Sequence, residues 1–213
     1  MKKEILIMKI ILLTLIYLLL TGCSKGAENA GDEAPISGSG GIPQSQIPQP
    51  DNSEIENAKM RISEYEKILE NEPGNVQYRL NLATAYYFLK EYNKAIDNFI
   101  KILGIDAKNM PALISLGNIY YDMKMHNKAI DYYKKALELD PDNLDVRCDM
   151  GTSYKELGMY DVAINEYKKN IKINPDHLNT RYNLSVVLTL SGHTKEAARE
   201  RSIYDSLASF QRQ

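Results

Sequence analysis

Apolar side chains recur at helical spacing through most of the chain. Residues 110–123 show this pattern clearly, because Leu113, Leu116, Ile119 and Tyr120 fall on one side of a helix. A second apolar stripe follows after a short polar gap, and the same alternation returns several times. The pattern predicts a series of short amphipathic helices.

The same residue types return every 34 positions. Internal periods of this length are typical of repeat proteins, in which each repeat is one unit of secondary structure. The recurring positions are Ala95, Ala129, Ala163 and Ala197; Tyr86, Tyr120 and Tyr154; Leu82, Leu116, Met150 and Leu184; the small residues Ala83, Gly117, Gly151 and Ser185; the aromatic residues Phe99, Tyr133 and Tyr167; and Pro73, Pro141 and Pro175. The period predicts an array of similar helical units.

Small residues and turn formers divide each unit into two helices. Gly117 and Ala129 leave room for two helices to approach closely. Pro141 ends the second helix, and Asp140 and Asn143 favour a turn around it. An isolated helix pair cannot bury both of its apolar faces, so neighbouring pairs are expected to stack into a solenoid.

The register resembles that of the tetratricopeptide-repeat (TPR) family, which has a helix A and a helix B in every repeat. Segment 110–143 carries nearly the whole family pattern, and segment 144–177 departs from it at Asn170, where a small residue is usual. The resemblance implies an all-α fold, a right-handed α-solenoid of stacked TPR helix pairs with one leading helix and four pairs. The pairs are expected at about 76–109, 110–143, 144–177 and 178–211.

The two ends of the array are expected to differ from its interior. Ser53 and Glu56 have the spacing of a capping box and precede a helical run at about 53–72, which matches only helix B of a repeat. In the last repeat, Arg201 and Asp205 stand where earlier repeats have apolar residues. A polar outer face is typical of a terminal repeat. The TPR domain is therefore expected to span 53–213.

The N-terminus has the pattern of a secretory signal. Residues 10–20 are uncharged and apolar and follow Lys2, Lys3 and Lys9. The run is shorter than the roughly 20 residues that a membrane-spanning helix needs. Translation could begin at Met1 or at Met8.

The sequence Leu20-Thr21-Gly22-Cys23 resembles the lipobox of bacterial lipoproteins. The resemblance implies a signal peptide at 1–22, cleavage before Cys23, and acylation of the Cys23 sulfur. An ordinary signal followed by a coincidental cysteine is the alternative. Ser24, in place of aspartate, favours the outer membrane if the source is Gram-negative. The expected location is the bacterial cell envelope, with the protein lipid-anchored to a membrane.

Residues 23–52 are expected to be the lipidated cysteine and a flexible tether. Residues 24–52 contain five Gly, four Pro and four Ser and no aromatic residue, so they cannot bury a core. A flexible chain of this length spans roughly 30 Å. That span is enough to hold a domain clear of lipid headgroups.

Charge and composition exclude several function classes. Lys and Arg total 26 and Asp and Glu total 28, so the chain lacks the basic excess of a nucleic-acid binder. His126, His177 and His193 lie in three different repeats without metal-ligand spacing. No catalytic residues, metal ligands or cofactor are expected, and the protein is not expected to be an enzyme.

By the geometry of the TPR family, function resides on the concave face formed mainly by the A helices. The resemblance implies that this peptide-binding groove contains Asn81, Thr84, Tyr87, Phe88, Ile114, Asn118, Tyr121, Asp149, Tyr182 and Asn183. Amide side chains beside aromatic pockets suit an extended peptide. The hypothesis is therefore a lipid-anchored adaptor or scaffold that binds a partner protein or peptide and assists assembly of an envelope machine.

A periplasmic carrier of a small apolar ligand is the alternative. Its pocket would be lined by Leu80, Tyr87, Phe88 and Ile114, and it would need to be deep and closed. The sequence leaves the partner, its pathway and the oligomeric state open.

Overall fold

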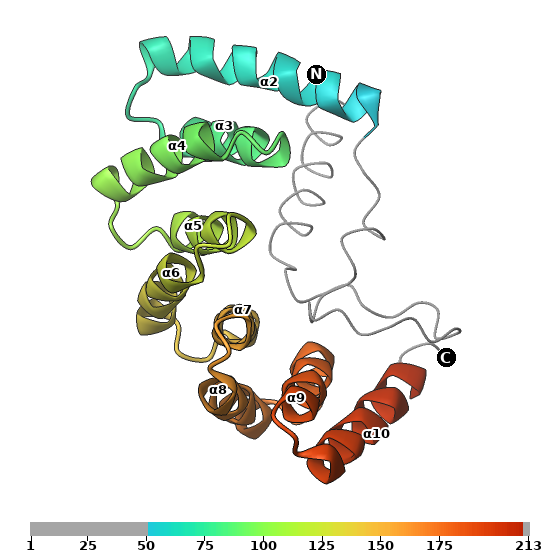
Figure 1. The fold of residues 1–213 in the computed structure, drawn as a ribbon. Coiled ribbons are helices and arrows are strands. Elements are labelled where there is room, and N and C mark those ends of the chain that lie inside the picture. Colours follow the sequence, from blue (N-terminus) through green and yellow to red (C-terminus); the bar gives the residue numbers. More distant parts are fainter. Residues whose placement is uncertain (1–50, 211–213) are drawn as a thin grey trace. The chain divides into compact units, whose positions relative to one another are not determined.

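A computed structural model describes residues 51–210 of the chain (Figure 1). The predicted signal peptide, Cys23 and most of the tether lie outside these residues and remain predictions. Residues 51–210 form nine α-helices and no strand. None of these helices is both long enough and apolar enough to cross a membrane. The helices fall into two compact units, one ending at Pro141 and the other beginning at Asp142.

The unit that ends at Pro141 contains a leading helix and two helix pairs. Each helix packs against the next along the chain, as the sequence colours of Figure 1 show. In chain order the helices are α2 (Asn52–Asn71), α3 (Val76–Phe88), α4 (Tyr92–Ile105), α5 (Met110–Asp122) and α6 (His126–Leu139).

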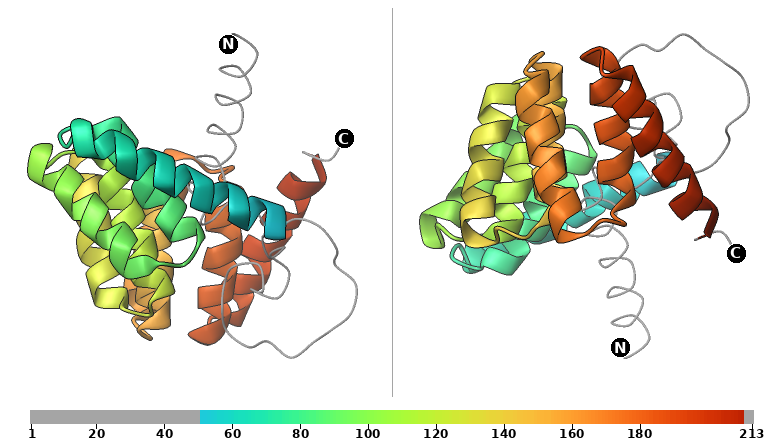
Figure 2. Two further views of the ribbon diagram at one scale, coloured as in Figure 1. Left: turned by 90° about the horizontal axis from the view of Figure 1, so that it is seen from above. Right: turned by 90° about the horizontal axis from the view of Figure 1, so that it is seen from below.

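The unit that begins at Asp142 contains two further pairs. Its helices are α7 (Leu144–Glu156), α8 (Tyr160–Ile173), α9 (Leu178–Leu190) and α10 (Thr194–Phe210). Consecutive helices pack together, and α7 also contacts α9. Figure 2 shows α9 and α10 side by side in both views. The predicted all-α solenoid, with one leading helix and four pairs, is confirmed in the described part of the chain.

Recurring asparagines begin the A helices. The side-chain oxygens of Asn75, Asn109 and Asn143 accept hydrogen bonds from the backbone N–H groups three residues later, at 3.1–3.2 Å. Such caps satisfy N–H groups that have no partner inside the helix. At α9 the same position holds His177, which makes no such bond and instead places Nδ1 2.7 Å from Oγ1 of Thr180.

The predicted cap of the leading helix is wrong by two residues. The N-cap is Asp51, whose Oδ1 accepts the N–H of Glu54 at 2.8 Å, while the carboxylate of Glu54 accepts the N–H of Asp51 at 3.0 Å. Ser53 is already inside the helix, and its hydroxyl donates to Asp51. The charged carboxylate of Asp51 is a stronger acceptor than a serine hydroxyl at the positive end of a helix.

Aromatic rings fill the space between the two helices of each central pair. Tyr133 and Tyr167 are fully buried, and each hydroxyl reaches a polar side chain on the preceding A helix. Tyr133 donates to Oδ1 of Asn118 at 2.8 Å, and the hydroxyl of Tyr167 lies 3.0 Å from Oγ1 of Thr152. The two bonds are one repeat apart and fix the same ring position in both units.

Asn170 fills the site where the repeat usually has a small residue. Its side chain is completely buried, and its Nδ2 donates to the carbonyl of Leu144 at 2.7 Å and to Oγ1 of Thr180 at 3.1 Å. Because these bonds reach α7 and α9, Asn170 ties three helices of the second unit together.

Candidate functional site

The ten predicted groove residues lie on the A helices of both units. Seven are on α3 and α5 of the first unit, and three are on α7 and α9 of the second. The two groups belong to different units. The seven residues of the first unit form its helix-A face: Asn81, Thr84, Tyr87, Phe88, Ile114, Asn118 and Tyr121.

A hydrogen bond joins the helix-A face across α3 and α5. The hydroxyl of Tyr87 donates to Oδ2 of Asp122 at 2.9 Å, and its ring lies 6.1 Å from that of Tyr92. Burial raises the pKa of Asp122, whereas the bond from Tyr87 and the nearby Lys124 and Lys90 act to lower it. The hydroxyl of Tyr87 therefore has a structural partner, and the half-buried ring is the part of the side chain left to contact a ligand.

The two amides of the helix-A face are used differently. Asn118 accepts the hydrogen bond from Tyr133 with Oδ1. Asn81 accepts from Nε2 of Gln77 with Oδ1 at 3.1 Å, and its Nδ2 has no hydrogen-bond partner in the described residues. Asn81 is half-buried. Its amide can therefore donate to a carbonyl group of a bound peptide.

The far end of the helix-A face is aromatic and basic. The ring of Tyr121 meets the ring of His126 edge to face, with centroids 5.2 Å apart, and Nζ of Lys124 lies 5.8 Å from the Tyr121 centroid. Thr84 and Phe88 are half-buried on α3. Ile114 is only 8% exposed, so it supports this surface from below and offers little area for contact.

The three predicted residues of the second unit differ in burial and in the residues that they contact. Asn183 is 2% exposed, and its Nδ2 lies 3.3 Å from Sγ of Cys148. Asp149 is half-buried on α7. Tyr182 packs against Tyr204, with ring centroids 5.4 Å apart. Of these three residues, Asp149 and Tyr182 retain exposed surface for a partner.

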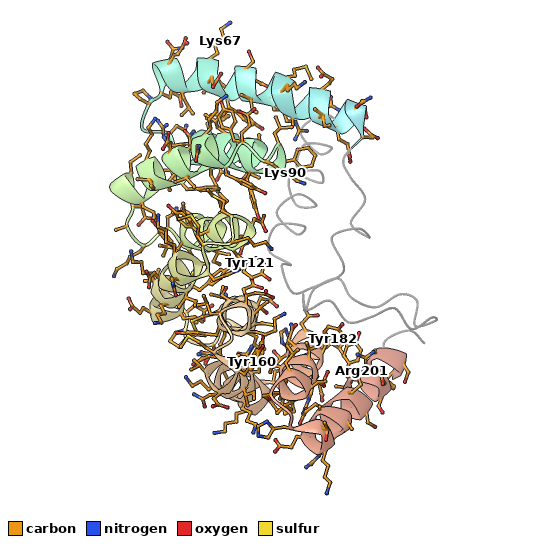
Figure 3. All side chains as sticks on the ribbon, in the orientation of Figure 1. Lys67, Lys90, Tyr121, Tyr160, Tyr182 and Arg201 are labelled. Atoms are coloured by element: carbon orange, nitrogen blue, oxygen red, sulfur yellow. The ribbon has the colours of Figure 1, made fainter. Side chains whose placement is uncertain are left out.

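Arg201 covers the ring of Tyr182. The two side chains lie together in Figure 3, and the guanidinium carbon is 5.3 Å from the Tyr182 centroid and 5.5 Å from that of Tyr204. A cation stacked on two rings fixes an exposed aromatic surface. Sequence reasoning assigned Arg201 only to the polar terminal face and missed this contact.

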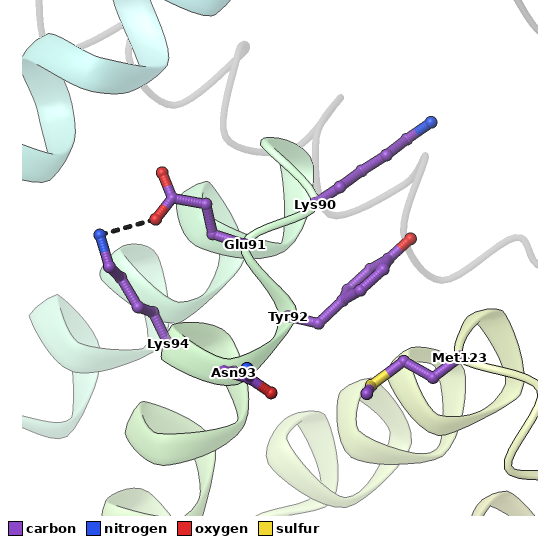
Figure 4. A pocket seen from close by; sticks show the side chains of 6 residues that line it. All are labelled: Lys90, Glu91, Tyr92, Asn93, Lys94 and Met123. Atoms are coloured by element: carbon purple, nitrogen blue, oxygen red, sulfur yellow. Dashed lines mark ion pairs between the residues drawn. The ribbon is translucent and has the colours of Figure 1, made fainter.

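A surface cavity of about 350 Å³ lies where the α3–α4 turn meets the end of α5 (Figure 4). Its lining includes Lys90, Tyr92 and Met123, and Lys90 extends away from the Glu91–Lys94 ion pair of 2.7 Å. None of the four residues expected to line an apolar ligand pocket belongs to this cavity. Within residues 51–210, no group of three His, Cys, Asp or Glu side chains is arranged to hold a metal ion.

Comparison with protein-family models decides the family. Three tetratricopeptide-repeat models match residues 76–109, 111–143 and 132–164. Residues 76–109 and 111–164 therefore match tetratricopeptide repeats. These matches include α3 to α6 of the first unit and α7 of the second, and so contain the whole helix-A face.

Solved structures of MamA have the same TPR fold. A crystal structure of MamA has a TM-score of 0.67 at 24% identity, covering 76% of this chain and 97% of that chain. MamA from Desulfovibrio magneticus RS-1, from residue 41 to its end, has a TM-score of 0.68 at 16% identity, covering 72% and 87%. A further MamA crystal structure has a TM-score of 0.66 at 25% identity, covering 72% and 84%. No curated protein sequence matches the chain.

TPR arrays expose long faces of adjacent helices to other molecules. Each repeat contacts only its neighbours, so a large part of every A helix remains available for binding. TPR proteins commonly use this surface for protein partners. The chain is therefore a protein-interaction scaffold.

Proposed function

We propose that the protein is a lipid-anchored, non-enzymatic TPR adaptor of the bacterial cell envelope that holds an extended segment of a partner protein on its helix-A face. The observation that carries this proposal is the Nδ2 of Asn81, which no described residue engages and which lies on the same side of α3 as Thr84 and Phe88. An amide donor beside aromatic surface matches the alternating carbonyl groups and side chains of an extended peptide. Participation in assembly of an envelope machine is part of the proposal.

The bond between Tyr87 and Asp122 supports this assignment. It joins the ends of α3 and α5 directly, so the two helices present their side chains in a fixed relation. A preformed surface loses less conformational freedom when a partner binds. Tyr121, with Lys124 and His126 around its ring, extends the surface toward α6.

Partner capture tests the groove. The full chain, carrying an affinity tag, is used to isolate partners from an envelope extract of the source cells. Asn81→Ala and Tyr121→Ala should each reduce recovery of the same partner at least fivefold, while Asp131→Ala, on the exposed side of α6, should leave it unchanged. Equal recovery in all variants, with unchanged helix content, would overturn the groove assignment.

A substitution of Cys23 tests the proposed lipid anchor separately. Cys23→Ser removes the sulfur that the proposed acyl group needs. The N-terminal peptide of the wild-type protein should carry the added mass of the acyl chains, and that of the variant should lack it. A wild-type N-terminal peptide without the added mass of acyl chains would argue against lipidation, whatever the result for the groove.

A further inference from the structure

An arginine recurs on the A helices with a carboxylate partner on the following B helix. Arg147 and Arg181 are one repeat apart, and each pairs with a glutamate at the same sequence separation. Nη1 of Arg147 lies 3.3 Å from Oε2 of Glu166, and Arg181 pairs with Glu200 in the same way. The side chains of Arg147 and Glu166 are only 13% and 10% exposed. The repeat therefore provides a largely buried position for a carboxylate beside this guanidinium.

The first helix pair keeps the arginine and lacks the carboxylate. Arg79 occupies the same place on α3, and Asn98 occupies the place of the glutamate on α4. Nη1 of Arg79 donates to Oδ1 of Asn98 at 3.2 Å, and Nη2 donates to the carbonyl of Pro73. Both acceptors are neutral, and Arg79 forms no ion pair with any described residue. A half-buried guanidinium forms its strongest hydrogen bonds with a charged acceptor.

A cavity opens at this guanidinium. It has a volume of about 460 Å³ and lies among α2, α3 and α4 of the first unit. Its charged lining consists of Arg79, Lys94 and Lys101 and the carboxylates Glu66, Glu70 and Asp97. None of these three carboxylates pairs with Arg79, and that of Glu66 accepts the hydroxyl of Tyr86. The cavity has room for an external group beside this guanidinium, where Asn98 stands in place of the glutamates of the two pairs of the second unit.

We propose that this cavity binds a carboxylate from another molecule, with Arg79 as its principal contact and Lys101 as a second cation. The bound carboxylate replaces Asn98 at Nη1 of Arg79, as Glu166 occupies Nη1 of Arg147. The site is distinct from the helix-A face and stands whether or not that face binds a peptide. Its ligand is either an acidic side chain of a partner protein or a small free polycarboxylate.

Two probes distinguish these sources. The full chain, held in mild detergent, is titrated by calorimetry with citrate and with a peptide of six glutamates at low ionic strength. Binding of citrate alone assigns the site to a free polycarboxylate, and tighter binding of the peptide assigns it to a protein segment. Absence of binding by both probes at millimolar concentration overturns the proposal.

Matched variants test the contact. Arg79→Gln should weaken probe binding at least tenfold, and Lys108→Gln, which removes one positive charge from the exposed turn after α4, should weaken it less than twofold.

Asn98→Glu rebuilds the internal partner found at Glu166 and Glu200, so it should also abolish binding and raise the midpoint of thermal unfolding. Asn127→Glu adds the same charge at a position of α6 away from the cavity and should retain binding. Binding by Asn98→Glu at the wild-type affinity would overturn the proposal, and Arg79→Gln provides the same test if Asn98→Glu fails to fold.

Discussion

The ring of Tyr133 occupies the space where a side chain on residue 117 would stand. A Cβ built on Gly117 would lie 2.4 Å from Cε1 and 2.6 Å from Cδ1 of that ring. The ring cannot move away cheaply, because it is 1% exposed and its hydroxyl is bonded to Asn118. The close approach of α5 and α6 thus depends on this glycine and tyrosine together.

Gly117→Ala should therefore destabilise the protein, by about 1–3 kcal/mol in the free energy of unfolding. Urea denaturation followed by circular dichroism measures this change. Gly104→Ala is the matched control, because no atom lies within 4 Å of a Cβ at this position of α4. It should stabilise the helix by about 0.5–1 kcal/mol. A Gly117→Ala protein as stable as the wild type would show that the helix pair is not closely packed.

The second residue after each A helix adopts a left-handed backbone conformation. It is glycine in the second unit, with φ of 73° at Gly158 and 83° at Gly192, and lysine in the first, with φ of 59° at Lys90 and 61° at Lys124. Side chains beyond glycine rarely adopt this conformation without cost.

Lys90→Gly should accordingly raise the free energy of unfolding by about 0.5–1 kcal/mol. Lys90→Ala is the control, because it removes the lysine charge but keeps a Cβ, and it should not stabilise the protein. Gly158→Ala should lower the free energy of unfolding by about 1 kcal/mol. Thermal unfolding of the three variants gives the comparison, and a stabilised Lys90→Ala would assign the gain to charge instead of backbone conformation.

The ion pair of Arg147 and Glu166 should contribute more to stability than an exposed pair. Glu166→Gln removes a largely buried carboxylate that pairs with Arg147 at 3.3 Å and with Lys169 at 2.7 Å, so it should cost about 1–3 kcal/mol. The exposed pair of Lys168 and Glu196, with side chains 53% and 57% exposed, is the comparison. Glu196→Gln should cost less than about 0.5 kcal/mol. Equal costs would contradict a structural role for the arginine–glutamate pairs.

The pH dependence of stability should report on Asp122. Burial raises the pKa of Asp122 above its ordinary value, so folding favours the protonated carboxyl. Asp122 then has no effect on the free energy of unfolding at a pH below the pKa that it has in the unfolded chain. As the pH rises from there through the higher pKa of the folded protein, the free energy of unfolding falls. Asp122→Asn should match the wild type at the acid end of the carboxyl range and become relatively more stable toward neutral pH.

Urea midpoints of both proteins across that range measure the difference, with Asp131→Asn on the exposed side of α6 as control. A wild-type protein that gains stability relative to Asp122→Asn as the pH rises would contradict the direction of the pKa shift. The bond from Tyr87 would then outweigh burial.

Much of the fold follows from the repeat period. The recurrence of Ala95 and Tyr86 with their counterparts predicts the helix pairs, because packing between neighbours repeats with the sequence. The contacts of Asn183 were not predictable in this way. The register places it on the A helix, but only the structure shows that Cys148 of α7 meets its amide and that the residue is buried.

The arginine–glutamate pairs show a second limit of prediction from the sequence. Arg147 and Arg181 recur at the repeat period and could have been noticed, but the partner of each lies on another helix. No helical spacing connects the two positions of a pair, so the pairing depends on how α7 meets α8 and α9 meets α10. The cap at Asp51 was missed for a different reason, since two possible caps stand two residues apart.

Site-specific photo-crosslinking tests the central proposal most directly. Phe88 on the helix-A face is replaced by p-benzoylphenylalanine in the full chain, expressed in the source cells, and Tyr132 on α6 is replaced in the same way as an aromatic control. Irradiation should join position 88, and not position 132, to one defined protein, and Asn81→Ala should reduce this product. Crosslinking at position 132 but not at 88, or none at either position, would contradict a partner bound to the helix-A face.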